Sequence, residues 1–272
     1  MILKLEGFQR SGSFKLRGAL NKLIALDTQT RAGVIAASGG NHGLGLAWAG
    51  WLTGVSVKVF VPSTTPTFKQ RRLEQTNAEV VYVNGGYAEA EAAALQEAHT
   101  TGKPYIHAYN DIEVISGQAT VVHEFKRQAP ELKTVVASIG GGGLAAGAVV
   151  ADEQLNVVGV EPEGAATMHT ALAMDRPIPL NEINTISADS LGAKVAGEIT
   201  FDICKQGLNR VELVADESLI AAQEWLWRHV RCPAELGACA GLAALTEGGL
   251  DQDEGPIGII ICGSNLDPKY LV

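Results

Sequence analysis

The chain alternates short runs of apolar, often β-branched residues with longer runs rich in alanine and leucine. Short apolar runs that end at glycine, proline or small polar residues are typical of buried strands. The predicted strands are Val55–Val61, Val80–Val83, Thr134–Ile139, Val157–Val160, Val211–Val214 and Ile257–Ile261.

The longer runs predict helices between and after these strands. They are Leu44–Trp51, Lys69–Asn77, Tyr87–His99, Ile115–Arg127, Leu144–Ala151, Glu217–Val230 and Ala238–Thr246. Asp216 is predicted to cap the helix that follows it, because its carboxylate is able to accept hydrogen bonds from the first free amides. The regular alternation of strands and helices predicts parallel sheets with both faces covered, so the expected fold class is α/β.

Composition and charge exclude several classes of protein. Of the 272 residues, 46% are hydrophobic and 19% are charged, as in a folded globular protein. The formal net charge of −9 repels phosphate backbones and argues against nucleic-acid binding. The cysteines form no CxxC pair, and the N-terminus lacks a signal-peptide pattern, so we expect reduced thiols and a cytoplasmic location. The uncharged stretch 134–151 contains four consecutive glycines, which argues against a membrane span.

The strongest local motif is Ser138–Gly147, SIGGGGLAAG, which follows a predicted strand and opens a predicted helix. Glycines allow a tight turn whose amides point at one anion, and the helix N-terminus adds partial positive charge. The motif therefore favours a phosphate site over a turn without a ligand. It also matches the dinucleotide fingerprint, and Glu161 follows Gly143 by 18 residues, near the place of a ribose-binding acid. From this segment alone, an NAD-dependent oxidoreductase stays open.

A second motif, Ser11–Ala19 (SGSFKLRGA), sets a lysine among small residues at the mouth of a helix. An amine that attacks an aldehyde must be unprotonated, and burial or a nearby cation such as Arg17 lowers a lysine pKa. Lys15 is therefore a candidate nucleophile. The alternative is a solvent-facing lysine on an amphipathic helix.

Two further motifs place small polar residues after apolar runs. Residues 37–43 (ASGGNHG) follow Val34–Ile35, and Asn41 with the loop amides suits a carboxylate or a ring hydroxyl. An ordinary Asx-type cap is the alternative. Residues 257–265 (IGIIICGSN) form a buried strand that ends where functional groups of open α/β sheets gather. The alternative there is a plain strand end with a buried cysteine.

In this order, the four motifs resemble those of the pyridoxal-phosphate enzymes of the tryptophan-synthase-β type (fold type II), and within that group the serine/threonine dehydratases, or ammonia-lyases. The resemblance runs from Met1 to about Asp267. It implies two open parallel-sheet domains: a larger cofactor-binding domain of residues 1–31 and 112–272, and a smaller substrate-side domain of residues 32–111. Residues 105–111 are interpreted as a crossing between them. Family members usually carry another strand and helix before the lysine, so the fold is expected to be N-terminally short.

The resemblance also implies roles for individual residues. Lys15 would form the Schiff base with the aldehyde of pyridoxal 5′-phosphate, and Phe14 would pack on the ring. Asn41 would hydrogen-bond the cofactor's 3′-oxygen, whereas Cys262 would face its pyridine nitrogen and Ser264 would complete that turn. The other expected cofactor-binding residues are Gly140, Gly141, Gly142, Gly143 and Leu144 at the phosphate and Glu235 beside the ring. The expected substrate-binding residues are Ser38, Gly39, Gly40 and His42.

Two departures from the family pattern bear on ligands. The family's metal-binding variant uses a glutamate, a backbone carbonyl and an aspartate. Glu161 and Ala165 match, but Thr167 replaces the aspartate, so no metal is predicted. The family's usual ADG segment reads ADSLG at residues 188–192, so the substrate pocket is expected to differ.

The implied function is a β-elimination, in which L-threonine, L-serine or both are dehydrated and deaminated to a 2-oxo acid and ammonia. Lys15 would be the general base at Cα, a small hydroxy amino acid the substrate, and a homodimer the expected assembly. A serine racemase or a β-replacement enzyme would share the fold. Racemases of this fold use a serine just before the Gly-Asn pair as second proton donor, and Gly39 stands there, which favours elimination. An NAD-dependent oxidoreductase and a non-catalytic remnant are the alternatives of other classes.

Overall fold

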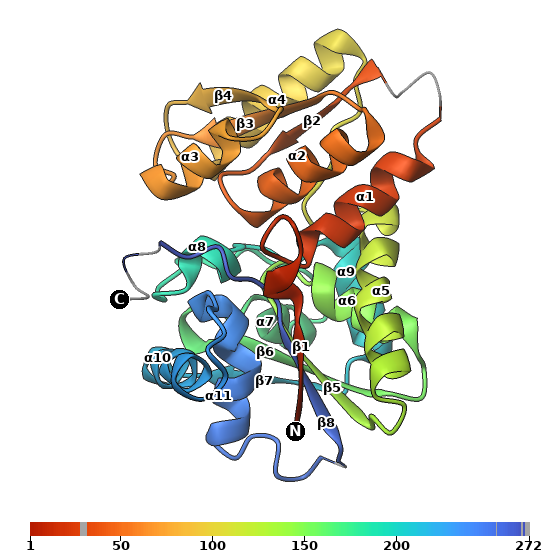
Figure 1. Ribbon diagram of the computed structural model, residues 1–272, viewed down its shortest axis with the longest axis vertical. Helices are drawn as coiled ribbons and strands as arrows, with labels where there is room; N and C mark the ends of the chain where they lie inside the picture. The colour runs from red at the N-terminus through yellow and green to blue at the C-terminus, as the bar shows by residue number, and fades with distance from the viewer. Residues whose placement is uncertain (28–31, 254, 268, 270–272) are drawn as a thin grey trace.

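The computed structural model describes residues 1–27, 32–253, 255–267 and 269 (Figure 1). Within these residues the strands form two separate sheets, one in the order β2-β3-β4 and one in the order β1-β8-β5-β6-β7. Neighbouring strands are parallel in both sheets. The fold is therefore α/β, as the alternating pattern predicts. None of the helices in the described ranges has the length and apolar character that a membrane crossing requires.

Both faces of the smaller sheet are covered by helices. Its elements are β2 (Val34–Ala37), α2 (Asn41–Thr53), β3 (Val57–Pro62), α3 (Thr67–Glu74), β4 (Glu79–Val83) and α4 (Tyr87–Thr101). Val34 and Ala36 belong to the hydrophobic cluster that includes α2, whereas Ile35 and Ala37 belong to the cluster that includes α4. This is why the strand is apolar at every position instead of alternating.

The larger sheet holds the main hydrophobic core. Its strands are β1 (Ile2–Leu5), β5 (Thr134–Ser138), β6 (Asn156–Pro162), β7 (Arg210–Val214) and β8 (Ile257–Ile261). Figure 1 shows α5 (Ile112–Gln128) and α6 (Gly143–Ala151) on one face, with α10 (Asp216–Trp225) and α11 (Ala240–Thr246) on the other. The remaining elements are η1 (Glu6–Phe8), η3 (Glu163–Ala165), α7 (Thr167–Ala173), α8 (Ala188–Leu191), α9 (Glu198–Gly207), the π-helical turn η4 (Leu226–Val230) and η5 (Leu236–Cys239).

Helix α1 (Lys15–Ala25) lies between the two sheets with their helices. It packs against α2 of the smaller sheet and α5 of the larger one. Its buried residues Leu16, Ala19 and Leu23 join the same hydrophobic cluster as one face of the smaller sheet. The expected domain boundary between residues 31 and 32 involves residues outside the described ranges. The expected boundary after Asp111 stays a prediction, and Asp111 itself caps α5 by accepting hydrogen bonds from the first amides of that helix.

The predicted strands and helices are all present, with shifted ends. The pattern does not predict β1 and β2, which are only four residues long. The predicted cap at Asp216 is wrong, because Ala215 is the N-cap residue and Asp216 is the first residue of α10. The Asp216 carboxylate accepts hydrogen bonds from Thr185 Oγ1 (2.5 Å) and Ile186 N (3.0 Å) instead, so it anchors the distant loop that precedes α8.

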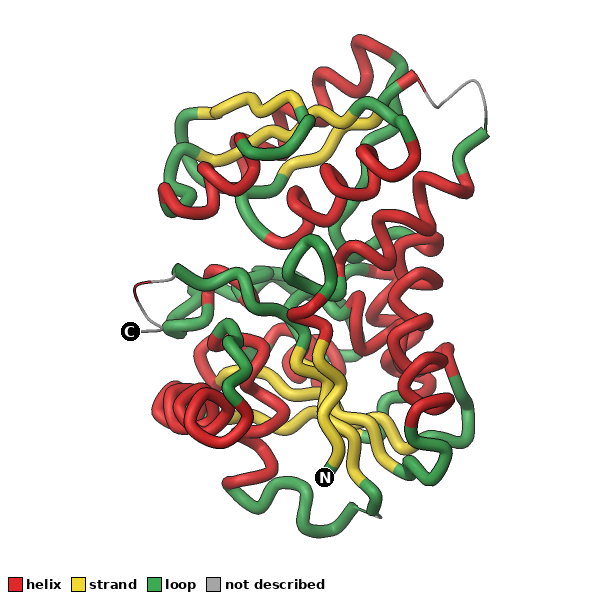
Figure 2. The backbone as a smooth tube through the Cα atoms, viewed as in Figure 1, coloured by secondary structure: helices red, strands yellow, loops and turns green. Residues whose placement is uncertain are grey.

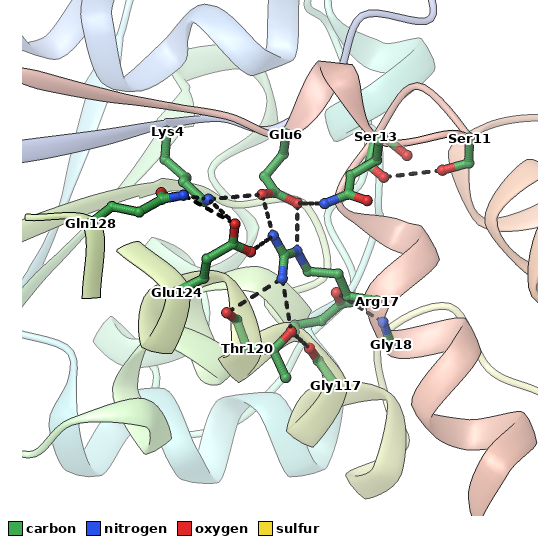
Figure 3. A network of polar contacts seen from close by, with 12 residues as sticks. Lys4, Glu6, Ser11, Ser13, Arg17, Gly18, Gly117, Thr120, Glu124 and Gln128 are labelled. Carbon is green, nitrogen blue, oxygen red and sulfur yellow. Dashed lines mark hydrogen bonds and ion pairs between the residues drawn. The ribbon is translucent and has the colours of Figure 1, made fainter. Parts of the chain in front are cut away.

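A buried ion-pair network joins α1 to β1 and α5 (Figure 3). The Glu6 side chain is 1% exposed and accepts hydrogen bonds from Arg17 Nε (2.7 Å) and Nη2 (2.8 Å). Arg17 also donates to Glu124 of α5, and Lys4 Nζ lies 3.1 Å from the same carboxylate. Since Arg17 is two residues after Lys15, the network holds in place the start of the helix that carries this lysine.

Replacing Glu6 by alanine should lower the free energy of unfolding by about 3–5 kcal/mol, because breaking a buried pair leaves a charge without its partner. Urea denaturation of Glu6→Ala beside the wild type measures this difference. Glu224→Ala is the matched control, since its ion pair with Arg228 (3.1 Å) is exposed and should contribute about 0.5 kcal/mol or less. Equal losses in the two variants would show that the Glu6 network adds no more than a surface pair.

Candidate active site

Figure 2 shows the strands in two separate groups, with loops and helix ends between them. Parallel strands bring their carboxyl ends to one edge, so the loops after β1, β5 and β8 meet there. The loop after β2 approaches from the smaller sheet, and Asn41 Nδ2 lies 2.9 Å from Glu235 Oε1 across the gap between the layers. Asn265 Nδ2, after β8, lies 2.6 Å from Asn41 Oδ1. The site is therefore assembled from both sheets.

Lys15 stands beside the end of β8. Ser13 and Gly263 form an antiparallel bridge, and Phe14 N donates to Cys262 O at 3.0 Å. Lys15 Nζ donates to Ala108 O at 2.8 Å and lies 5.1 Å from the centre of the Phe14 ring. Burial of Nζ lowers the pKa of Lys15 to about 8, although Cys262 acts in the opposite direction. A lysine with this pKa is partly uncharged near neutral pH, which is the form that attacks an aldehyde.

The glycine loop between β5 and α6 offers free backbone amides. Gly142 is the N-cap of α6 with φ +96°, a conformation that glycine adopts without strain. A Cβ atom on Gly141 would overlap the Tyr109 ring, so the protein itself also requires glycine there. Within the described residues, the amides of residues 140–144 donate no hydrogen bond to the protein. Free amides at a helix N-terminus are suited to a phosphate.

A second uncapped helix N-terminus belongs to α2. Gly40 is its N-cap residue and supplies no side chain, and the amides of Gly39 and Asn41 have no acceptor among the described residues. Ser38 Oγ accepts a hydrogen bond from Gly40 N at 3.1 Å. The ring of His42 is buried with Nε2 2.9 Å from Ile106 O, and burial lowers its pKa to about 3. The His42 ring is therefore neutral and hydrogen-bonded to Ile106 O. The backbone amides of the loop are the groups that remain available to bind an anion.

Cys262 and Ser264 follow β8. Burial raises the pKa of the Cys262 thiol to about 12, so the thiol is neutral. Ser264 Oγ donates to Gly7 O at 2.9 Å, and Ser264 N donates to Gly12 O at 2.8 Å. In this structure Ser264 therefore connects the β8 loop to the loop that precedes Lys15.

Glu235 is the buried acid that joins the two sides of the site. Its carboxylate accepts hydrogen bonds from Asn41 Nδ2 (2.9 and 3.1 Å) and from Asn265 N (3.0 Å). Burial raises the pKa of Glu235, and Lys69 is the largest of the influences that lower it. Two cations of α3 reach the same region: Lys69 Nζ lies 2.8 Å from Asp189 Oδ2, and Arg72 donates to Asn265 Oδ1. These pairs connect the smaller sheet to the larger one.

The segment 105–111, expected only as a crossing, contributes functional groups that the sequence analysis did not assign. His107 Nδ1 accepts hydrogen bonds from Tyr109 N (3.2 Å) and Asn110 N (2.9 Å), which shapes a turn. This turn directs Ala108 O at Lys15 and lays the Tyr109 ring on the glycine loop. The signal in the sequence is the clustering of aromatic and histidine residues in YIHAYND.

Glu161 is used by the protein itself. Burial raises the pKa of its carboxyl to about 8, and its two oxygens accept hydrogen bonds from Met168 N (2.7 Å) and His169 N (2.9 Å) at the start of α7. A carboxylate committed to a helix N-terminus is not presented to a ribose, which argues against a dinucleotide site. Thr167 Oγ1 donates to Ala193 O at 2.8 Å. A hydroxyl donor thus stands where the metal-binding variant needs an anionic ligand, so these residues do not fit a metal ion.

The groups around Lys15 fit a phosphate-bearing aldehyde such as pyridoxal phosphate. The loop at residues 140–144 supplies free amides for a phosphate, and Lys15 supplies an amine whose pKa is about 8. Phe14 supplies an apolar ring and Cys262 a neutral thiol. The contact of each residue with the cofactor stays a prediction.

Comparison with known proteins agrees with this chemistry. A family model described as "Pyridoxal-phosphate dependent enzyme" matches residues 1–263. A phenylserine dehydratase from Ralstonia pickettii is 36% identical over 271 residues, which cover 97% of this chain and 82% of that protein. The structure of the processed threonine deaminase isoform 2 of Solanum lycopersicum has a TM-score of 0.93 at 33% identity, covering 99% of this chain and 80% of that one. Maize serine racemase also has a TM-score of 0.93, at 30% identity, covering 99% and 84%.

The family match spans almost the whole chain, and the arrangement of both sheets is shared with threonine deaminase. The chain belongs to the family of pyridoxal-phosphate-dependent enzymes, in the fold type II group that contains the threonine and serine dehydratases.

Proposed function

We propose that this enzyme removes water and ammonia from L-threonine, L-serine or both, and so produces a 2-oxo acid. The observation that carries the proposal is the Lys15 amine, which has a pKa of about 8, is held by Ala108 O and lies next to a neutral Cys262. The similarity to phenylserine dehydratase and threonine deaminase along nearly the full chain supports the same reaction class.

Each group of the site has a proposed task. The amides of residues 140–144 bind the phosphate of the cofactor, and Phe14 packs on its ring. The free amides at the N-terminus of α2, in the loop Ser38–His42, bind the substrate carboxylate, because the helix end carries partial positive charge. When bound, pyridoxal phosphate supplies the electron sink for the negative charge that develops at Cα.

Lys15 removes the proton from Cα as a general base. A pKa of about 8 suits this task, since the amine is partly unprotonated at neutral pH and still basic enough to hold the proton. Ala108 O then accepts a hydrogen bond from the charged amine and keeps Nζ in place. The neutral Cys262 would offer no negative charge to the pyridine nitrogen, and a nitrogen without that charge would stay unprotonated, which would favour elimination over transamination.

Serine racemase is the second candidate function, because maize serine racemase superposes as well as threonine deaminase does. Racemisation needs a proton donor on the side of Cα opposite to Lys15. Gly39 has no side chain to provide it, and the Ser38 hydroxyl is turned toward Gly40 N. These two observations favour elimination over racemisation, whereas a β-replacement reaction would use the same residues.

We further propose that the protein is a cytoplasmic homodimer. Each subunit would consist of a larger domain of residues 1–31 and 112–272 and a smaller domain of residues 32–111. The four cysteines, Cys204, Cys232, Cys239 and Cys262, are free and buried, which supports a reducing compartment. The dimer rests on the family resemblance alone, and sedimentation of the purified protein tests it.

Replacing Lys15 by alanine should abolish turnover and covalent attachment of the cofactor, because no other amine of the described residues donates a hydrogen bond to Ala108 O. Borohydride reduction of the wild type should attach pyridoxal phosphate irreversibly to the peptide that contains Lys15. Mass spectrometry of the digested protein measures the added mass on that peptide. If Lys15→Ala still carries reduced cofactor at the site, the assignment of Lys15 is wrong.

Attachment of the cofactor should depend on pH with a midpoint near 8. Only the uncharged amine reacts with an aldehyde, and burial favours that form, so the attachment rate should rise with pH and level off above about 8. The measurement is the absorbance change on mixing apoenzyme with pyridoxal phosphate from pH 6 to 10. N-acetyl-lysine amide is the control, because an ordinary lysine keeps rising to about 10.4. The same midpoint for both would contradict the burial of Nζ.

The enzyme should convert L-serine to pyruvate much faster than it converts L-serine to D-serine, because the site lacks a side-chain proton donor at position 39. A keto-acid assay and a chiral amino-acid assay on the same reaction give both rates. Formation of D-serine as fast as pyruvate would refute the preference for elimination and make Ser38 the first residue to test as a second base.

A further inference from the structure

Thr65 occupies the space beside Gly39. A Cβ atom added to Gly39 would overlap Thr65 Oγ1 and would lie 2.8 Å from Cγ2 and 2.9 Å from Cβ of the same residue. A side chain at position 39 and the threonine at position 65 therefore exclude each other. The threonine takes the place that a longer residue at position 39 would fill.

The backbone of Thr65 is firmly held in this position. Thr65 lies in the turn between β3 and α3, where its N donates to Pro62 O at 3.0 Å. Gln70 Nε2 donates to Thr65 O at 2.7 Å. These bonds hold the backbone of the turn between β3 and α3, from which the Thr65 side chain reaches Gly39 in the loop that begins α2.

The Thr65 hydroxyl has no hydrogen-bond partner among the residues that the structure describes, and the residue is partly exposed. The hydroxyl of Ser38 accepts a hydrogen bond from Gly40 N within the same loop and keeps its own hydrogen to donate. The donors available to a ligand at this end of α2 are thus the hydroxyls of Thr65 and Ser38, together with the free amides of Gly39 and Asn41.

We propose that Thr65 is a substrate-binding residue, which donates a hydrogen bond to the substrate carboxylate from the place that Gly39 leaves empty. The inference rests on the proposed function, because it takes the N-terminus of α2 as the carboxylate site. A hydroxyl and free amides are all donors, and such donors suit an anion.

Thr65 acts as a hydrogen-bond donor and not as an acid. Neither a cation nor a general base forms a hydrogen bond or ion pair with its hydroxyl among the described residues, so nothing there activates the group to give up its proton. Thr65 therefore strengthens substrate binding at position 39 without replacing the proton donor that racemisation needs.

The test is the binding of L-alanine to the holoenzyme, followed by absorbance of the cofactor. L-Alanine has the carboxylate but no β-hydroxyl, so binding is measured without elimination. Thr65→Val keeps the shape and removes the hydroxyl, and should raise the dissociation constant about tenfold, as the loss of one hydrogen bond to a charged group does. Thr65→Ser keeps the hydroxyl and should restore tight binding. Thr64→Val is the control, because that exposed side chain points at Gly85 O (3.5 Å).

L-Alaninamide distinguishes a carboxylate contact from packing, since it lacks the negative charge. Its dissociation constant should not change in Thr65→Val. An equal rise for both ligands would show that Thr65 only packs, and no rise for either would show that it makes no contact. Loss of D-serine formation in Thr65→Val, with L-alanine binding intact, would make Thr65 a proton donor. Each of these results overturns the proposal.

Exchange of the two side chains provides an independent test. Gly39→Ser alone should weaken L-alanine binding, because the new side chain meets Thr65, and Gly39→Ser combined with Thr65→Ala should restore it. Failure of the double variant to exceed Gly39→Ser would contradict the shared space. A wild type that binds L-alanine but releases no 2-oxo acid from L-serine or L-threonine would refute the proposed function and leave this inference standing.

Discussion

The pairing of the first strand with the last is the constraint on which the site depends. β1 runs parallel to β8 from Ile2 beside Gly258 to Leu5 beside Ile261, and the contact continues into the bridge between Ser13 and Gly263. Through this pairing, residues from distant parts of the sequence place Lys15 next to Cys262. Gly12 has φ +76°, and a Cβ atom there would overlap the side chain of Asn265, so this side chain lies directly against the backbone of the Gly12 loop. A lysine on a surface helix would have neither this burial nor these neighbours.

Burial acts on the titratable groups of the site in one direction, toward their neutral forms. It lowers the pKa of Lys15 to about 8 and of His42 to about 3, and it raises the pKa of Cys262 to about 12. Removing water disfavours whichever form of a group is charged. An uncharged amine is what the attack on an aldehyde requires, and an uncharged thiol is what the proposed contact with the ring nitrogen would require. The same packing that stabilises the fold therefore prepares the chemistry.

The sequence alone predicts the α/β class and the strands β3 to β8, because short apolar runs that alternate with alanine- and leucine-rich runs form a local pattern. It does not predict β1 and β2, which become strands by pairing with β8 and β3, and β1 pairs with a strand at the other end of the chain. Asp216 has the residue type and spacing of a cap, yet a distant loop takes up its carboxylate. The same limit applies to Ala108, whose carbonyl group meets Lys15 because of how the layers pack. The candidate site residues could be predicted from the resemblance to a known family, whereas the groups that they contact could be identified only in the folded structure.

Asn41 shows how the two sheets are tied together at the site. Its Nδ2 donates to Glu235 and its Oδ1 accepts from Asn265, while Arg72 donates to the Oδ1 of that second asparagine. Both ends of the Asn41 amide are thus in use in this structure. If Asn41 binds a ring oxygen of the cofactor, as the family resemblance implies, one of the two N–H groups of its Nδ2 would turn from the Glu235 carboxylate to that oxygen. Glu235 would keep the Asn265 amide as a partner, and Lys69 lies near enough to favour its charge. Because a partner would remain on each side, this exchange would avoid the penalty of a buried charge left unpaired, and it would connect occupation of the site to the contacts that hold the smaller sheet against the larger one.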